Sequence, residues 1–197
     1  MPSCEAGKEV GMGARTVLQS ADITRAMTRI AHEVLEANHG GSDLVLLGIP
    51  TRGAVLAERL ARVLESIETG AGTVGTLDVT MHRDDLGRGI GRAPHRTVIP
   101  ASGIDGKVVV LVDDVLYSGR TVRAALDALQ TIGRPRAVRL AVLVDRGHRE
   151  LPIRADHVGK NLPTAADERI SLHLAETDGV DEVVIEGART APEVTVR

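Results

Sequence analysis

The chain has 197 residues, 43% hydrophobic and 26% charged, which is ordinary for one globular domain with a buried core. Its net charge of −3, with one tyrosine and no Phe or Trp, argues against a general nucleic-acid coat and against base stacking on aromatic side chains. No apolar run approaches the ~20 residues that span a bilayer. The N-terminus lacks the apolar core of a signal peptide, and the single cysteine, Cys4, excludes a disulfide framework. We therefore expect a cytoplasmic protein.

The first part of the chain alternates helical and strand patterns. Apolar residues at helical spacing predict a helix over residues 21–37, with Ser20 as its N-cap. The continuous apolar run 44–49 predicts a strand buried on both faces. A turn at 50–53 and a second helix follow, and residues 74–81 indicate another strand.

The second part begins with a polar stretch, 82–98, which has no periodicity and predicts a long functional or disordered loop. Residues 108–112 predict a buried strand that ends in an Asp113-Asp114 turn. A helix to about Ile132 and a strand over 138–144 come next. Shorter strands are predicted near the remaining apolar runs, at 156–159, 170–174 and 182–186.

This alternation predicts an α/β fold with right-handed crossovers and a mostly parallel central sheet flanked by helices. We expect one domain over 20–187, with flexible tails at 1–19 and 188–197. Ligands of such sheets bind outside the carboxyl ends of the strands. The turns after Ile49, Val112 and Val144 all lie at that edge.

The segment 112–121 carries the most specific chemistry. Adjacent carboxylates at the end of a buried strand, Asp113 and Asp114, are strong acceptors for the two hydroxyls of a ribose diol. The following residues open a helix whose free N–H groups and dipole favour a phosphate. Together they predict a ribose 5-phosphate site. A P-loop is excluded because the chain has no Gly-x-x-x-x-Gly-Lys-Ser/Thr.

Residues 112–121 resemble the signature of the type I phosphoribosyltransferases, which bind 5-phosphoribosyl-1-pyrophosphate (PRPP). Residues 48–53 resemble the pyrophosphate loop of that family, and residues 83–86 resemble the start of its mobile catalytic loop. Residues 144–156 and 159–164, with Thr28 to Glu33, are similar to one subgroup. That subgroup combines uracil phosphoribosyltransferase activity with regulation of pyrimidine operons.

The resemblance implies the type I phosphoribosyltransferase fold with a small hood, and a set of site residues. The implied catalytic residues are Arg83, Asp113 and Asp114, and the implied uracil-binding residues are Arg146 and Ile170. PRPP or UMP would be bound by Thr51, Arg52, Asp113, Asp114, Val115, Leu116, Tyr117, Ser118, Gly119, Arg120 and Thr121. His82 stands where the family usually has Tyr, and we assign it no role.

The implied cofactor is Mg²⁺, held mainly through the pyrophosphate of PRPP. No Cys/His cluster with metal-ligand spacing is present, so we predict no metal site made by the protein itself. Implied partners are PRPP, uracil, UMP or UTP, the pyr leader mRNA, and further copies of the chain in a homodimer or larger assembly.

A basic surface for RNA is predicted from two segments. Arg25, Arg29 and His32 form one stripe on the first helix, although Glu36 weakens its charge. Further positive groups come from a second segment, His148, Arg149, Arg154 and Lys160. Alternatives are a uracil salvage enzyme alone, or a nucleotide-sensing RNA-binding protein without turnover. The RNA sequence and the level of control, transcription or translation, stay open.

Overall fold

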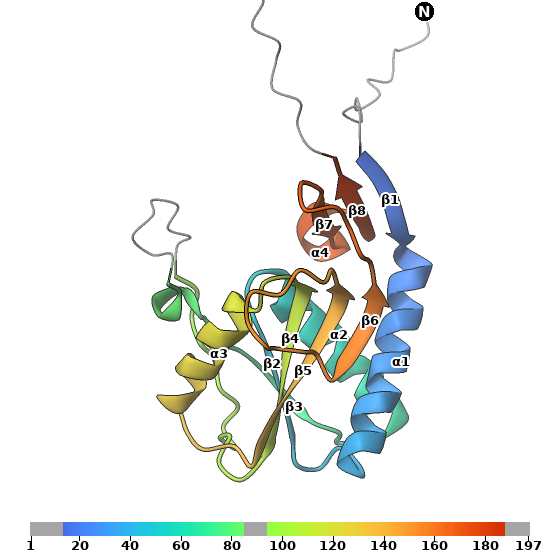
Figure 1. Ribbon diagram of the computed structural model, residues 1–197. Helices are drawn as coiled ribbons and strands as arrows, with labels where there is room; N and C mark the ends of the chain where they lie inside the picture. Colours follow the sequence, from blue (N-terminus) through green and yellow to red (C-terminus); the bar gives the residue numbers. More distant parts are fainter. Residues whose placement is uncertain (1–13, 85–93, 188–197) are drawn as a thin grey trace, which may run out of the picture.

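A computed structural model gives the fold and describes residues 14–84 and 94–187 (Figure 1). Its centre is a five-stranded sheet in the order β3-β2-β4-β5-β6, in which all neighbouring strands are parallel. The strands are β2 (Leu44–Gly48), β3 (Thr73–Thr76), β4 (Val108–Leu116), β5 (Ala137–Asp145) and β6 (His157–Asn161). The predicted α/β class and the parallel central sheet are confirmed.

Helices cover both faces of this sheet, which explains the continuous apolar runs of its strands. Helices α1 (Ser20–Asn38) and α2 (Arg52–Ile67) pack on one face, and α3 (Arg120–Gln130) packs on the other. Successive strand residues point to opposite faces, so Val110 joins the α1/α2 core and Leu111 joins the α3 core. Within the described residues, no helix is long and apolar enough to cross a membrane.

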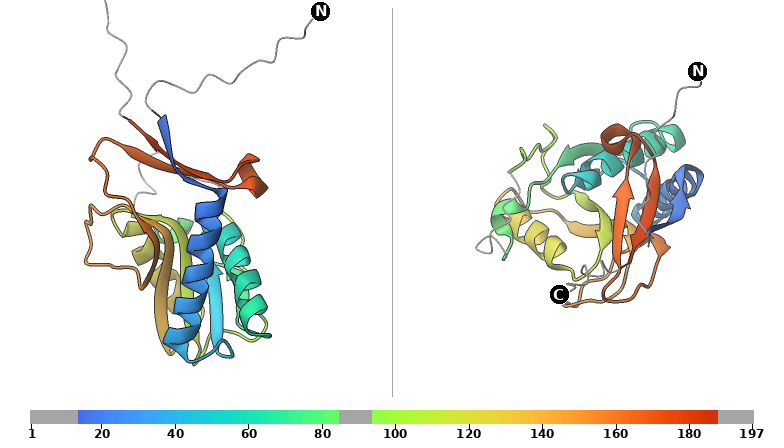
Figure 2. Two further views of the ribbon diagram at one scale, coloured as in Figure 1. Left: turned by 90° about the vertical axis from the view of Figure 1, so that its right-hand side faces the viewer. Right: turned by 90° about the horizontal axis from the view of Figure 1, so that it is seen from above.

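A second, three-stranded antiparallel sheet lies beyond the carboxyl ends of the parallel strands (Figure 2), and we call it the hood. Its order is β1-β8-β7, made of β1 (Ala14–Gln19), β7 (Arg169–His173) and β8 (Glu182–Glu186). The short helix α4 (Ala175–Asp178) connects β7 to β8. Apolar side chains of β7 and β8 join the α1/α2 core, which anchors the hood to the main sheet.

Strand β1 corrects the predicted boundary of the N-terminal tail, which placed Ala14–Gln19 outside the domain. Thr16 pairs with Val184 and donates a 3.0 Å hydrogen bond to Glu182, both at the far end of the chain. A six-residue strand with a mixed burial pattern has little local signal, and its partner is remote in sequence. Residues 1–13 and 188–197, the rest of the predicted tails, lie outside the described residues.

Two further boundaries differ from the sequence prediction. The strand predicted over 74–81 ends at Thr76, and a short 3₁₀ helix, η1, occupies Thr80–His82. Asp78 turns the chain there, because its carboxylate accepts hydrogen bonds from the N–H and the hydroxyl of Thr80, at 3.1 and 2.6 Å. The predicted turn at Asp113-Asp114 is also wrong, because β4 continues to Leu116. Residues 85–93 of the predicted loop lie outside the described residues.

Candidate active site

A polar pocket of about 130 Å³, which we call the β4 pocket, opens at the carboxyl ends of β2 and β4. It brings together residues from three segments: the turns after Ile49 and Val112, which the sequence analysis placed at one sheet edge, and the Arg83 segment, which it linked to them by resemblance. The lining residues are Ile49, Pro50, Thr51, Arg52, Val79, Arg83, Asp113, Asp114, Val115 and Thr121. The position at this edge of a parallel sheet is the one expected for a ligand site.

The two carboxylates of the β4 pocket are fixed by the strand that carries them. Asp113 is only 7% exposed, and its Oδ1 accepts the N–H of Asp114 at 2.9 Å. Asp114 in turn accepts the N–H of Val115 at 2.8 Å. Burial raises the pKa of Asp113 well above its usual range, the neighbouring Asp114 charge adds to this, and Arg83 opposes it. A ligand that donates hydrogen bonds here would offset part of the cost of burying this charge.

The phosphate turn predicted after β4 joins the strand directly to α3. Gly119 has φ +91°, a left-handed conformation that favours glycine, and α3 begins at the next residue. Thr121, in the first turn of α3, lines the β4 pocket, so the free N–H groups of that turn begin at the pocket edge. The Ser118 carbonyl accepts the N–H groups of Glu150 and Leu151 at 3.0 and 3.1 Å, which braces the turn from outside.

The side chain of Arg120 forms ion pairs outside the phosphate turn. Its guanidinium donates to the carboxylates of Asp84 and Glu150, the latter at 2.6 Å. Through these bonds it connects α3 to the segment that carries Arg83. These ion pairs hold the start of α3 against Asp84 and Glu150.

The predicted pyrophosphate loop lies beside the carboxylates. The Pro50-Thr51 peptide bond is cis, and α2 begins at Arg52. A Cβ at Gly53 would lie 2.5 Å from the Val112 carbonyl oxygen, so glycine is needed where α2 approaches β4. Arg52 lines the β4 pocket and also pairs with Asp178 of the hood, Nη2 to Oδ1 at 3.1 Å.

Arg146, predicted to contact uracil, is placed over the ring of Tyr117. Its guanidinium carbon is 4.3 Å from the ring centroid, a cation–π contact, and the residue is 8% exposed. Nε donates to Thr164 at 2.7 Å and Nη2 donates to the Ala165 carbonyl at 3.1 Å. Ile170 belongs to β7 of the hood and its side chain packs into the α1/α2 core, so its backbone is left for the predicted base contact.

A larger pocket of about 480 Å³ lies beyond the end of β5, and Arg146, Arg149, Arg154 and Asn161 are among its lining residues. Arg149, predicted to bind RNA, instead holds together the segment that follows β5. Its guanidinium pairs with Asp145 at 2.5 Å and donates to three carbonyl groups, those of Tyr117, Gly147 and Ile153, at 2.8–3.1 Å. These bonds leave it few donors for another ligand. The sequence analysis missed this structural role.

The predicted basic stripe of α1 lies against β6. Arg29 donates to the carbonyl groups of Val158, at 2.9 Å, and Gly159, and so approaches the strand that carries Lys160. Arg25 pairs with Asp22, whereas His32 is exposed. The structure thus brings the α1 stripe and the Lys160 segment side by side, and it places Arg149 and Arg154 together around the pocket beyond β5.

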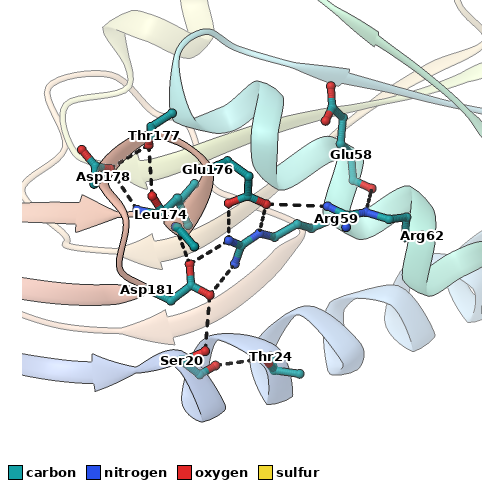
Figure 3. A network of polar contacts seen from close by, with 11 residues as sticks. Ser20, Thr24, Glu58, Arg59, Arg62, Leu174, Glu176, Thr177, Asp178 and Asp181 are labelled. Atoms are coloured by element: carbon teal, nitrogen blue, oxygen red, sulfur yellow. Dashed lines mark hydrogen bonds and ion pairs between the residues drawn. The ribbon is translucent and has the colours of Figure 1, made fainter.

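A polar network that the sequence analysis did not predict joins the hood to α1 and α2 (Figure 3). Arg59 of α2 donates from Nε to Glu176 at 2.9 Å and from Nη2 to Asp181 at 2.7 Å. Ser20, at the start of α1, donates to the same Asp181 at 3.3 Å. Hydrogen bonds from Arg59 to these carboxylates raise the pKa of Arg59. The one sequence feature that could have indicated this network is the seven-residue spacing of Arg52 and Arg59, which places both on one face of α2.

The fold and the β4 pocket define a class of enzymes that act on phosphorylated ribose, and comparison with known proteins identifies it. The phosphoribosyl transferase domain family matches residues 13–170, and the chain belongs to this family. The hypoxanthine phosphoribosyltransferase of Trypanosoma cruzi in complex with the product IMP shares the fold, with a TM-score of 0.67 and 19% identity over 95% of each chain.

Within that family the chain is similar to the proteins named bifunctional protein PyrR. It is 66% identical to that of Leifsonia xyli subsp. xyli over 180 residues, 89% of this chain and 98% of the relative. Identity to that of Streptomyces coelicolor is 63% over 179 residues, 91% and 93% of the two chains. The resemblance found in the sequence, both to the family and to the subgroup, is confirmed.

Proposed function

We propose that this protein transfers the phosphoribosyl group of PRPP to N1 of uracil, which gives UMP and pyrophosphate. We propose further that it regulates pyrimidine biosynthetic genes by binding pyr mRNA when uridine nucleotides are bound. The observation that carries the enzymatic proposal is the β4 pocket, where paired carboxylates, a helix N-terminus and two arginines converge. The bifunctional name of the similar PyrR proteins supports the combination.

Each part of PRPP has a matching group. The ribose diol donates to Asp113 and Asp114, which the strand holds at the pocket wall. The 5-phosphate lies on the first turn of α3 with Ser118 and Thr121, and the pyrophosphate lies on Thr51 and Arg52. Arg83 stabilises the charge that grows on the leaving pyrophosphate. Catalysis is then positioning and charge stabilisation, without a covalent intermediate on the protein.

The β4 pocket suits a Mg²⁺ ion that arrives with PRPP. Among the described residues, no group of three or more His, Cys, Asp and Glu side chains converges as a metal site, whereas Asp113 and Asp114 offer carboxylate oxygens in the pocket. Mg²⁺ binds through one or two carboxylates plus phosphate oxygens and water. When bound, it neutralises charge on the pyrophosphate.

Uracil is expected on the Tyr117 side of the β4 pocket. Arg146 stacks on the Tyr117 ring there and would cover the base, and the hood backbone near Ile170 would supply polar groups for its edge. Purine-specific members of the family carry an acidic residue where Tyr117 stands, so the tyrosine favours a pyrimidine.

The test is product formation from PRPP, Mg²⁺ and one base at a time. We expect UMP from uracil and no nucleotide from adenine, hypoxanthine or orotate. Activity with hypoxanthine instead of uracil would overturn the assignment. Binding of UMP and PRPP without any product would favour the alternative of a nucleotide sensor without turnover.

The RNA-binding proposal rests on the α1 stripe and the neighbouring β6, in a cytoplasmic homodimer or larger assembly. Affinity for the leader RNA should fall as salt rises and should increase with UMP. The sharpest variant is Arg25→Ala/His32→Ala, because both side chains are exposed and Arg29 keeps its bonds to β6. Arg62→Ala, which removes an exposed arginine from α2, is the control. Equal binding by both variants and no UMP effect would leave a uracil salvage enzyme alone.

A further inference from the structure

We propose that Asp178, in the hood, is a positioning residue that holds Arg52 in the orientation in which it binds the pyrophosphate of the donor. This inference rests on the proposed function and extends it, because it assigns a part in donor binding to a residue outside the β4 pocket. Asp178 ends α4, whereas Arg52 begins α2 and lines the pocket.

The contact is well defined on the hood side. Nη2 of Arg52 lies 3.1 and 3.4 Å from the two oxygens of the Asp178 carboxylate. That carboxylate also accepts the N–H of Leu174 at 2.9 Å and the hydroxyl of Thr177 at 2.7 Å. These donors lower the pKa of Asp178, the Leu174 N–H most, so the group is ionised at neutral pH. The acceptor that meets Arg52 is therefore fixed before any ligand binds.

The guanidinium keeps donors for a ligand while it is held by Asp178. Only Nη2 is used in that contact, and Nε is buried without a hydrogen-bond partner among the described residues. A guanidinium presents five N–H groups in a rigid fork, so one side can pair with a carboxylate while others bind phosphate oxygens. Asp178 thus reduces the rotamer freedom that Arg52 would otherwise lose on binding pyrophosphate.

The hood segment that carries Asp178 is itself fixed to the helix that carries Arg52. Arg59 lies two turns after Arg52 on the same face of α2, and it pairs with Glu176 and Asp181 on either side of Asp178 (Figure 3). Asp181 additionally accepts the N–H of Ala175 at 2.8 Å. The turn from Leu174 to Asp181 is therefore a platform, attached at Arg59, that presents one carboxylate to Arg52.

The direction of the change in Asp178→Asn distinguishes positioning from simple charge. Removing a negative charge beside an anion site should tighten anion binding if only Coulomb attraction mattered. Positioning predicts the opposite, so we expect the Kd for PRPP with Mg²⁺, measured by calorimetry, to rise about tenfold. The Kd for UMP should stay unchanged, because UMP carries no pyrophosphate.

Two controls separate a direct from an indirect effect. Glu176→Gln removes a charge from the same short helix but leaves Arg59 bound to Asp181, so PRPP affinity should not change. In an Arg52→Ala background, Asp178→Asn should cause no further loss, because Asp178 acts through Arg52.

Three outcomes would overturn the inference. Unchanged or tighter PRPP binding by Asp178→Asn would show that Asp178 does not position Arg52 or competes with the ligand. An equal loss with and without Arg52 would show that Asp178 acts on the ligand or its metal directly. A wild-type protein that does not bind PRPP would overturn the proposed function and this inference with it. Failure of the inference alone appears only in the variants, so it is distinguishable from failure of the proposed function.

Discussion

The β4 pocket and the hood use charge in opposite ways. In the pocket, a rigid strand holds the Asp113 carboxylate in a buried position that raises its pKa, so the folded protein is destabilised by the group that the ligand needs. In the hood, the carboxylates of Glu176 and Asp181 have lowered pKa values, chiefly because each accepts hydrogen bonds from Arg59. Charges in the pocket serve binding at the expense of stability, whereas charges in the hood hold two layers of the fold together.

The largest expected effect tests the pocket side of this comparison. Asp113→Ala/Asp114→Ala should lower kcat/KM by at least about 10³-fold, because the diol of the donor loses both of its carboxylate acceptors. The circular dichroism spectrum should stay native. The control is Asp127→Ala, which removes an exposed carboxylate of α3. A double variant with unchanged kcat/KM would exclude the pair from the active site.

Arg83→Ala should reduce the single-turnover rate about 10²-fold with a smaller loss of donor affinity, because its contact with the leaving pyrophosphate strengthens in the transition state. Since Arg83 also lowers the pKa of Asp113, the acid limb of the pH–rate profile should move to higher pH in the variant. A change in KM alone would instead show that Arg83 binds the ground state.

The hood side is tested by Arg59→Ala, which leaves two carboxylates without their shared partner. We expect about 2 kcal/mol of destabilisation, or a Tm lower by roughly 4–8 °C. Hydrogen exchange should rise in β7 and β8 and stay slow in β4. The difference from wild type should shrink as pH falls through the lowered pKa values of Glu176 and Asp181. The control is Arg62→Ala, which removes an exposed ion pair, Nη2 of Arg62 to Oε1 of Glu176 at 3.7 Å. It should change the stability almost not at all.

The smallest expected effect is a gain of stability. Asp113→Asn keeps an acceptor for the Asp114 N–H and removes the buried charge, so Tm should rise by a few degrees, about 1 kcal/mol, while PRPP binding is lost. A raised pKa means that the folded protein holds its proton longer than the unfolded chain. The penalty is therefore absent at acidic pH and grows as pH rises through the raised value. A gain that is equal at all pH values would contradict this origin.

The residues alone predicted the part of the candidate site that lies close together in the chain, whereas the roles of Thr51, Arg52 and Arg83 came from the resemblance to the family. Asp113, Gly119 and Thr121 belong to one short segment, so strand, turn and helix start could be read together. The extension of β4 through Asp113 could not be predicted, because two adjacent aspartates favour a turn when read locally. The roles of Arg149 and Asp178 depend on contacts with remote segments, and no local pattern distinguishes them from exposed charges.

The order of strands in the hood sets the order in which the protein can be completed during synthesis. Leu18 of β1 pairs with Val183 of β8. Strand β1, near the start of the described chain, can therefore pair only after β8, near its end, has been synthesised. The whole parallel sheet, residues 44–161, leaves the ribosome before either remaining hood strand. Until then Leu18 has no strand to pair with, and closing so long a loop is slow. A nascent or truncated chain that stops before β8 would expose the apolar face that the hood covers, which makes premature termination a route to aggregation.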